Sequence, residues 1–238
     1  MRNQKEKAFT KTSVKKAVVL LSGGLDSATV LAVAKSENCV VTAITFSYGQ
    51  RHLTELNAAK AQALFWKVEE HLIAEVDFSP IGGSALTSHF DVPKNRPPEE
   101  IGKDPPITYV PARNAVFLSY GLAVAEPRGI REIFIGANAV DFSGYPDCRP
   151  EFIEAFEAMA RTATVAGMKG ENFRVRAPLL KMTKGEIIKL GAKLGVDYAK
   201  TWTCYDPDRS GNPCLRCESC FLRARGFEEA SIPDPLLR

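Results

Sequence analysis

The chain has 238 residues, of which 45% are hydrophobic and 25% are charged, so it can bury one sizeable core like an ordinary globular protein. Its 31 basic and 28 acidic residues give a net charge of +3, too small to indicate binding to nucleic acid or a membrane surface. No apolar run approaches the ~20 residues that span a bilayer. Residues 1–16 are polar and lysine-rich, without the apolar part of a signal peptide. We expect a cytoplasmic protein in which residues 1–16 form a flexible extension.

The first element of the fold is an apolar segment, residues 17–21, which predicts a strand buried on both faces of a parallel sheet. It ends in the glycine turn Ser22-Gly23-Gly24, after which a helix is expected to open at Asp26 and run to about Lys35. Backbone amides in the first turn of such a helix, with the positive end of the helix dipole behind them, bind phosphate or pyrophosphate. The segment therefore predicts a nucleotide-binding unit.

This loop differs from the two common phosphate loops. No Lys-Ser or Lys-Thr follows the glycines, and the pattern G-x-G-x-x-G is absent. The loop resembles instead the pyrophosphate loop SGGxDS of ATP pyrophosphatases, which generally cleave ATP between the α and β phosphates and transfer AMP to a substrate oxygen. The alternative is an ordinary glycine-rich turn between a strand and a helix. The resemblance assigns ATP to Leu21, Ser22, Gly23, Gly24, Leu25, Asp26, Ser27, Ala28, Thr29, Val30 and Leu31, with Mg²⁺ held by Asp26.

Strand and helix signals alternate along the rest of the chain. Apolar runs predict strands at residues 39–46, 71–76, 131–136 and 173–177. Helical spacing predicts helices at residues 53–66, 115–126 and 151–166, and a capping box at Thr183 to Glu186 opens another that ends near Leu194. This order predicts an α/β fold with a doubly wound parallel sheet over residues 17–200. The resemblance of the phosphate loop further implies that this sheet is Rossmann-like, as in the adenine nucleotide alpha hydrolases.

Two segments stand outside this alternation. Residues 80–111 are rich in glycine, serine, proline and charge, so we expect no packed core from them and predict a lid loop. Residues 137–149 gather polar, aromatic and cationic side chains directly after a strand, where ligands bind in open α/β sheets. A turn-rich surface loop is the alternative interpretation of residues 137–149.

Four of the six cysteines, Cys204, Cys214, Cys217 and Cys220, form the pattern C-x9-C-x2-C-x2-C. In a cytosolic protein this spacing indicates a metal site rather than disulfides. We predict one structural Zn²⁺ per chain in a zinc-binding tail at residues 201–238, with an iron–sulfur cluster as the competitor. The other two cysteines lie elsewhere: Cys39 heads an apolar strand and is expected in the core, whereas Cys148 is either a packed thiol or a site residue.

Several motifs in chain order resemble the QueC family of the PP-loop superfamily. They are the loop Ser22–Ser27, Tyr48-Gly49-Gln50-Arg51-His52, Pro111-Ala112-Arg113-Asn114, Gly136-Ala137-Asn138, Asp141 to Arg149, and Trp202-Thr203-Cys204-Tyr205 with the three later cysteines. The resemblance implies a Rossmann-like fold with a zinc-binding tail. It also implies a homodimer, since members of the family are often dimers.

The resemblance further implies that 7-carboxy-7-deazaguanine and ammonia become 7-cyano-7-deazaguanine (preQ0) at the expense of ATP, in the route to queuosine. Adenylation makes the carboxylate oxygen a leaving group, ammonia then gives an amide, and a second adenylation allows loss of AMP to leave the nitrile. By matching position, Asp26, Ser27 and Arg113 are expected to be catalytic, and Asn138, Asp141, Tyr145, Asp147 and Arg149 to bind the substrate.

Other functions share some of these features. A tRNA thiolation enzyme would need a sulfur-carrying cysteine, for which Cys148 is the candidate, and an amide-forming ligase would share the loop. A zinc nucleic-acid-binding protein would need a basic surface, of which Arg216, Arg223 and Arg225 give a weak hint. We expect small-molecule substrates, with no direct nucleic-acid or membrane partner.

Overall fold

The computed structural model describes residues 14–49, 53–101, 104–138 and 145–237. Its five strands form one sheet in the order β3-β2-β1-β4-β5, and every neighbouring pair is parallel. The strands are β1 (Lys16–Leu20), β2 (Val40–Ser47), β3 (Glu70–Glu75), β4 (Glu132–Phe134) and β5 (Arg174–Arg176). All overlap the segments predicted from the sequence, so the α/β fold with a parallel sheet is confirmed.

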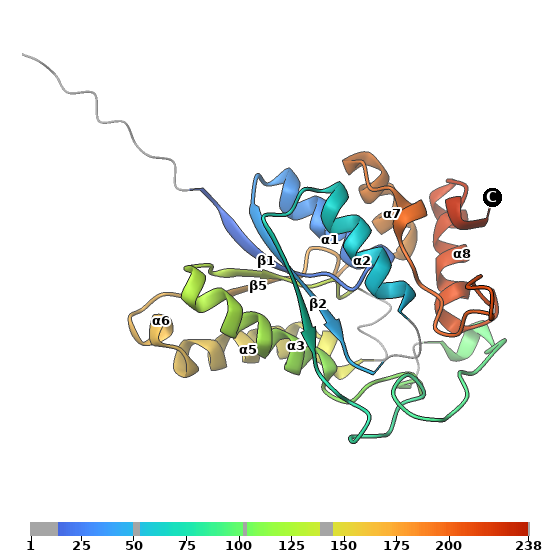
Figure 1. The fold of residues 1–238 in the computed structure, drawn as a ribbon, viewed down its shortest axis with the longest axis horizontal. Helices are drawn as coiled ribbons and strands as arrows, with labels where there is room; N and C mark the ends of the chain where they lie inside the picture. Colours follow the sequence, from blue (N-terminus) through green and yellow to red (C-terminus); the bar gives the residue numbers. More distant parts are fainter. Residues whose placement is uncertain (1–13, 50–52, 102–103, 139–144, 238) are drawn as a thin grey trace, which may run out of the picture.

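Helices cover both faces of this sheet (Figure 1). One face carries α1 (Leu25–Ser36), α2 (Thr54–Phe65) and α7 (Lys184–Leu194), and the other carries α3 (Arg113–Ala125), α5 (Pro150–Ala163) and α6 (Val165–Met168). The last helix, α8 (Glu218–Ala230), packs against α7 near the C-terminus. No helix was expected at the position of α8 from the sequence pattern.

The central strand β1 is apolar and buried from Ala17 to Leu20, after an exposed Lys16 at its start. Val18 and Leu20 belong to the buried cluster on the α3 and α5 side, whereas Ala17 and Val19 belong to the cluster on the α1 and α7 side. Because successive side chains of a strand point to opposite faces, a strand covered on both sides must be apolar at every position. β1 is therefore the centre of both cores.

The helix predicted at residues 151–166 is interrupted, so that prediction is wrong at its end. α5 ends at Ala163, and Thr164 takes an extended conformation before α6 begins. The Thr164 hydroxyl accepts a hydrogen bond from the Gly167 backbone N–H at 2.9 Å and donates to the Ala160 carbonyl at 2.7 Å. A threonine that caps a new helix in this way stops the preceding one.

Residues 80–111 were expected to build no packed core, and the structure contradicts this at four positions. Ala85, Leu86, Val92 and Val110 are buried in the cluster on the α3 side. The segment is also tied to the start of α8, where Arg96 forms an ion pair with Glu218 at 3.1 Å. Its use as a lid stays a prediction.

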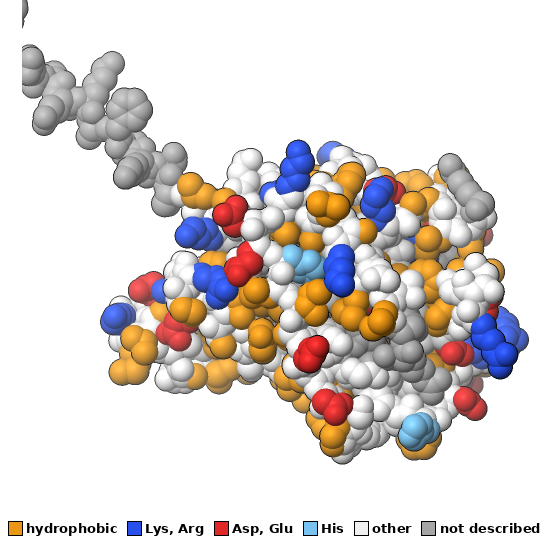
Figure 2. All heavy atoms as spheres, viewed as in Figure 1, with side chains coloured by type: hydrophobic (Ala, Val, Ile, Leu, Met, Phe, Trp, Pro, Cys, Tyr) orange, Lys and Arg blue, Asp and Glu red, His pale blue; other side chains and the backbone are white. Residues whose placement is uncertain are grey.

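No helix in the described part of the chain is long and apolar enough to cross a membrane. The face shown in Figure 2 mixes acidic and basic side chains with apolar ones. This mixed surface agrees with the nearly balanced charge of the sequence.

Candidate active site

The turn between β1 and α1 is closed by its own hydroxyl groups. Ser27 Oγ accepts hydrogen bonds from the Ser22 backbone N–H at 3.2 Å and from Ser22 Oγ at 3.0 Å, and it donates to the Gly24 carbonyl at 3.1 Å. Gly23 has a φ of +86°, and a Cβ atom there would lie 2.3 Å from the carbonyl oxygen of Glu55. Only glycine permits this backbone approach.

A cavity of about 240 Å³ opens beside this turn, at the carboxyl ends of β1, β2 and β4. Such a position, where chain connections leave the central strand in opposite directions, is the usual ligand site of an open α/β sheet. Among the predicted ATP residues, those that line the cavity are Leu21, Ser22, Gly24, Leu25, Asp26 and Ser27. The remaining four of α1, Ala28, Thr29, Val30 and Leu31, are buried in the helix packing instead.

Asp26 is held at the cavity wall by two donors. Its Oδ2 atom lies 2.5 Å from Lys184 Nζ and accepts a hydrogen bond from Asn138 Nδ2 at 3.2 Å. The other oxygen, Oδ1, is buried and has no hydrogen-bond partner among the residues that the structure describes. Since Mg²⁺ binds proteins through one or two carboxylates, this unpaired oxygen beside a phosphate loop fits the predicted magnesium ligand.

Lys184 is a site residue that the sequence pattern did not predict, because residues 183–186 indicate only a capping box. The structure confirms the capping box. Thr183 Oγ1 accepts a hydrogen bond from the Glu186 backbone N–H at 3.2 Å, and Glu186 Oε2 accepts one from the Thr183 N–H at 2.8 Å. A lysine in the first turn of a helix faces the positive end of the helix dipole, which is unfavourable. This conflict was the available signal that Lys184 serves another purpose.

Arg113 enters the cavity from the first residue of α3. The residue before it, Ala112, has a left-handed φ of +54°, a conformation uncommon for any residue with a side chain. Asp147 stabilises this helix start, because its carboxylate accepts a hydrogen bond from the Asn114 backbone N–H at 2.9 Å. Asn114 also donates to the Cys148 thiol at 3.1 Å, so the buried Cys148 is a packed thiol at the cavity wall.

Two other ionisable groups face Arg113. The buried Tyr48 ring lies 5.8 Å from the Arg113 guanidinium carbon, and burial raises the pKa of the Tyr48 hydroxyl to about 12. Glu55 also lines the cavity. Desolvation raises the pKa of its carboxyl to about 7, although the positive charge of Arg113 acts in the opposite direction.

The residues predicted to bind the substrate take different positions. Tyr145 lines the cavity. Asn138 is fully buried and reaches Asp26, whereas Asp147 caps α3. Arg149 is exposed and donates to the Pro146 carbonyl at 3.4 Å. Asp141 lies outside the described residues.

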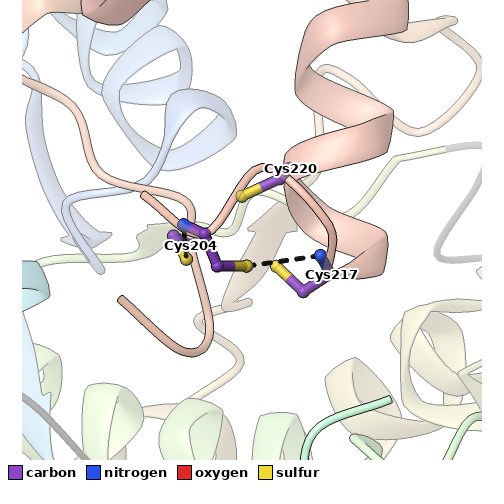
Figure 3. A group of neighbouring side chains, drawn as sticks. Cys204, Cys217 and Cys220 are labelled. Atoms are coloured by element: carbon purple, nitrogen blue, oxygen red, sulfur yellow. Dashed lines mark hydrogen bonds between the residues drawn. The ribbon is translucent and has the colours of Figure 1, made fainter. Parts of the chain in front are cut away.

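The four C-terminal cysteines come together as the spacing predicts. Their Sγ atoms all lie within 4.8 Å of one another, and Figure 3 shows Cys204, Cys217 and Cys220 pointing toward a common centre. Tetrahedral zinc at Zn–S distances of about 2.3 Å requires thiolates at this kind of separation. Backbone N–H groups support the sulfurs, since Cys214 donates to Cys204 Sγ at 3.2 Å and Cys217 to Cys214 Sγ at 3.3 Å. The cluster can therefore hold a metal ion. Cys39 is buried in the core as expected.

Residues around the cysteine cluster build one wall of the cavity, namely Trp202, Thr203, Tyr205 and Ser219. The Trp202 backbone N–H donates to the Gly23 carbonyl at 2.9 Å, which ties this wall to the phosphate loop. Ser219 Oγ links the two sites further, because it lies 3.2 Å from Cys217 Sγ and donates to the Thr203 carbonyl at 2.7 Å.

Of the three arginines that hinted at nucleic-acid binding, Arg223 is not at the surface. It is buried and forms an ion pair with Asp234 at 2.7 Å. It also donates to Thr201 Oγ1 at 2.9 Å and to the Tyr198 carbonyl at 3.2 Å. Arg223 therefore holds the end of the chain against residues 198–203, which lead into the cavity wall.

Comparison with known proteins agrees with this geometry. The family model described as "Queuosine biosynthesis protein QueC" matches residues 16–231. The chain is 56% identical over 220 residues to the 7-cyano-7-deazaguanine synthase of Kineococcus radiotolerans, covering 92% of this chain and 96% of that one. It is 57% identical over 221 residues to the protein of the same name from Desulfatibacillum aliphaticivorans, covering 92% and 95%.

A third relative of the same name, from Myxococcus xanthus, is 54% identical over 222 residues, covering 93% of this chain and 96% of that one. Among solved structures, that of NMN synthetase from Francisella tularensis aligns with a TM-score of 0.48 at 14% identity, covering 92% of this chain and 88% of that one. This structural similarity is too low to add to what the sheet itself shows.

Proposed function

This chain belongs to the QueC family of queuosine biosynthesis proteins, and from that premise we propose that its cavity converts 7-carboxy-7-deazaguanine, ammonia and ATP into 7-cyano-7-deazaguanine. The observation that carries the proposal is that Asp26, in the phosphate loop, and Arg113 line one cavity. A phosphate site and a cation suited to a substrate carboxylate thus share the space in which a carboxylate must attack the α-phosphate of ATP.

We assign the pyrophosphate part of ATP to the turn Ser22–Ser27 and the start of α1. Backbone N–H groups in the first turn of a helix have no carbonyl acceptor within the helix, and the helix dipole favours negative charge at this end. Asp26 would hold Mg²⁺, which neutralises charge on the departing pyrophosphate. Lys184, beside Asp26, adds a positive charge at the same end of the cavity.

Arg113 is placed to orient the substrate carboxylate. An arginine binds a carboxylate through paired N–H donors, and this geometry can leave one oxygen directed at the α-phosphate. Transfer of AMP to that oxygen, with pyrophosphate leaving, makes the carbon open to attack by ammonia. The resulting amide oxygen can take a second AMP in the same position, so one adenylating site serves both steps. Tyr145, which lines the cavity, is a candidate for contact with the deazaguanine ring.

The tail supports this site through a structural Zn²⁺ on Cys204, Cys214, Cys217 and Cys220. Four cysteine ligands leave no open coordination position, which is typical of structural rather than catalytic zinc. The metal would fix residues 202–205 and 219, which form the cavity wall. The homodimer and the cytoplasmic location stay predictions.

Product analysis tests the proposed function. The purified protein is incubated with ATP, Mg²⁺, 7-carboxy-7-deazaguanine and ammonium labelled with heavy nitrogen, and the products are identified by mass spectrometry. We expect the label in the cyano group, with AMP and pyrophosphate as the nucleotide products, and heavy oxygen passing from a labelled carboxylate to AMP. ADP and phosphate as primary products would contradict adenylation, since the loop lacks the lysine that P-loops place on the β and γ phosphates.

A further inference from the structure

Glu55 is a cavity residue to which the adenylation chemistry assigns no role. It is the second residue of α2, and its backbone carbonyl packs directly against Gly23 of the phosphate loop. Its side chain lines the same cavity as Asp26 and Arg113. The close approach between Gly23 and α2 thus fixes a carboxyl group beside the place where the adenylated substrate would form.

The charged and titratable groups around Glu55 come from several elements. Arg113 acts on it from α3, and Tyr48 faces it from the end of β2. Tyr145 and Tyr205 face Arg113, while Asp26 and Lys184 lie in the cavity wall on α1 and α7. Within the described ranges, no side chain donates a hydrogen bond to the Glu55 carboxyl, and Glu55 lines the cavity.

We propose that Glu55 is the catalytic base that removes protons from the nitrogen atom during conversion of the carboxylate to the nitrile. The inference rests on the proposed function. Every proton of ammonia must leave the nitrogen before a nitrile exists, so the reaction needs a proton acceptor near the substrate carbon. Glu55 is a carboxyl group in that space with no other partner assigned to it.

The proton transfers balance as follows. Ammonia attacks the adenylated carbonyl carbon, a C–N bond forms, the C–O bond to AMP breaks with its electron pair leaving on AMP, and the extra proton on nitrogen moves to Glu55. When the amide oxygen attacks the α-phosphate of a second ATP, the bond between the α and β phosphates breaks, pyrophosphate leaves, and a further N–H proton moves to Glu55. Finally the last N–H proton leaves to Glu55 while the second C–O bond breaks and the C≡N bond forms. Glu55 returns each proton to solvent between steps.

The other cavity groups are less suited to this task. Asp26 is already bound by Lys184 and Asn138, and the raised pKa of Tyr48 keeps its hydroxyl protonated near neutral pH. Arg113 and Lys184 are cations. A carboxyl whose pKa lies at about 7 can both accept and release a proton at physiological pH, which is the condition for efficient base catalysis.

The test compares the wild type with Glu55→Gln, which keeps the size of the side chain but cannot accept a proton. The first measurement is exchange of labelled pyrophosphate into ATP in the presence of 7-carboxy-7-deazaguanine, which reports adenylation alone. The second is the single-turnover rate of amide and nitrile formation at several pH values. Glu154→Gln, at an exposed position of α5, is the matched control.

We expect Glu55→Gln to keep pyrophosphate exchange at close to the wild-type rate while amide and nitrile formation fall about 100-fold. The defect should shrink as the pH rises, because hydroxide from solvent can then remove the nitrogen protons in place of Glu55. Glu154→Gln should match the wild type in both assays. Should Glu55→Gln fail to fold, Glu55→Asp gives the same comparison, with exchange retained and nitrogen addition slowed.

Two results would overturn the assignment. Unchanged nitrile formation in Glu55→Gln would show that another group takes the protons. Loss of exchange in a folded variant, in proportion to the loss of nitrile, would show that Glu55 binds the substrate instead. Absence of exchange in the wild type would refute the proposed function itself. A failure of the Glu55 assignment alone would leave exchange in the wild type intact.

Discussion

The ammonium group of Lys184 lies 2.5 Å from a carboxylate oxygen of Asp26, although the two residues are 158 positions apart in the chain. Each belongs to the first turn of its helix, Asp26 in α1 and Lys184 in α7. Both side chains line the cavity, so the pair brings one positive and one negative group to the phosphate end of the site. The two groups can then divide between phosphate and metal when ATP binds.

Lys184→Met should weaken the use of ATP. Methionine keeps most of the volume of the side chain but removes the charge that faces the phosphates. Because a hydrogen bond to a charged group contributes about 1.5–3 kcal/mol, we expect kcat/KM for ATP to fall about 10- to 100-fold. Steady-state kinetics at varied ATP concentration measure this effect.

The exposed Lys189 of the same helix supplies the control, and Lys189→Met should leave the kinetics unchanged. Equal kcat/KM for the wild type and Lys184→Met would show that Lys184 contributes neither charge at the phosphates nor support for Asp26.

Asp26→Asn should preserve the fold and lose most turnover. The amide cannot supply the negative charge that Mg²⁺ requires, so charge on the departing pyrophosphate is less well neutralised. We expect about a 100-fold loss in pyrophosphate exchange with little change in thermal unfolding. Full activity at saturating magnesium would mean that Asp26 has another role.

The cysteine cluster predicts a dependence of stability on zinc. The purified protein should be colourless and contain about one zinc per chain, and Cys217→Ser should lose most of it. Because metal binding contributes to the free energy of folding, Cys217→Ser should lower Tm by about 10 °C, or roughly 3 kcal/mol for a chain of this size. Metal analysis and calorimetry measure the two effects.

Cys39→Ala removes a buried thiol outside the cluster and serves as the control, because it should keep the zinc. Visible absorption bands together with stoichiometric iron would show that the four cysteines hold an iron–sulfur cluster and not zinc.

Glu55 should also make folding stability depend on pH. Its pKa rises from the ordinary value of 4.5 to about 7 in the folded protein, so the folded state binds a proton more tightly than the unfolded state. Its contribution to stability is therefore present below pH 4.5 and is lost as the pH rises through 7.

Urea unfolding at pH 5 and pH 8 tests this dependence. The unfolding free energy of Glu55→Gln minus that of the wild type should be higher at pH 8 than at pH 5, by on the order of 1–3 kcal/mol. A difference that stays constant with pH would show that the Glu55 carboxyl titrates normally.

The sequence predicted the centre of the sheet well because its central strand is a short apolar run. Residues 17–21, for example, have no polar face, which suits only a strand covered on both sides. The cysteine cluster was equally predictable, since its ligands are close in sequence and their spacing is itself the signal.

The features that were missed depend on contacts between distant segments. α8 escaped notice because one of its buried positions is Arg223, whose charge interrupts the apolar pattern and is compensated by Asp234. Glu55 looks like an ordinary helix residue until the fold brings it to the cavity, and the position of Lys184 in the first turn of α7 does not show which group it meets. Their spacing carries no information about Asp26 or Arg113.

The hydrogen bond from Trp202 to Gly23 has a consequence for the order in which this protein is made. The phosphate loop leaves the ribosome early, but the wall that completes it comes from residues 202–223, and Arg223 is held in turn by Asp234. The cavity wall is therefore complete only after residues 202–223 have been synthesised, and Arg223 gains its ion pair only after Asp234 has been added. A chain that stops before residue 234 lacks the carboxylate that pairs with the buried Arg223 beside this wall.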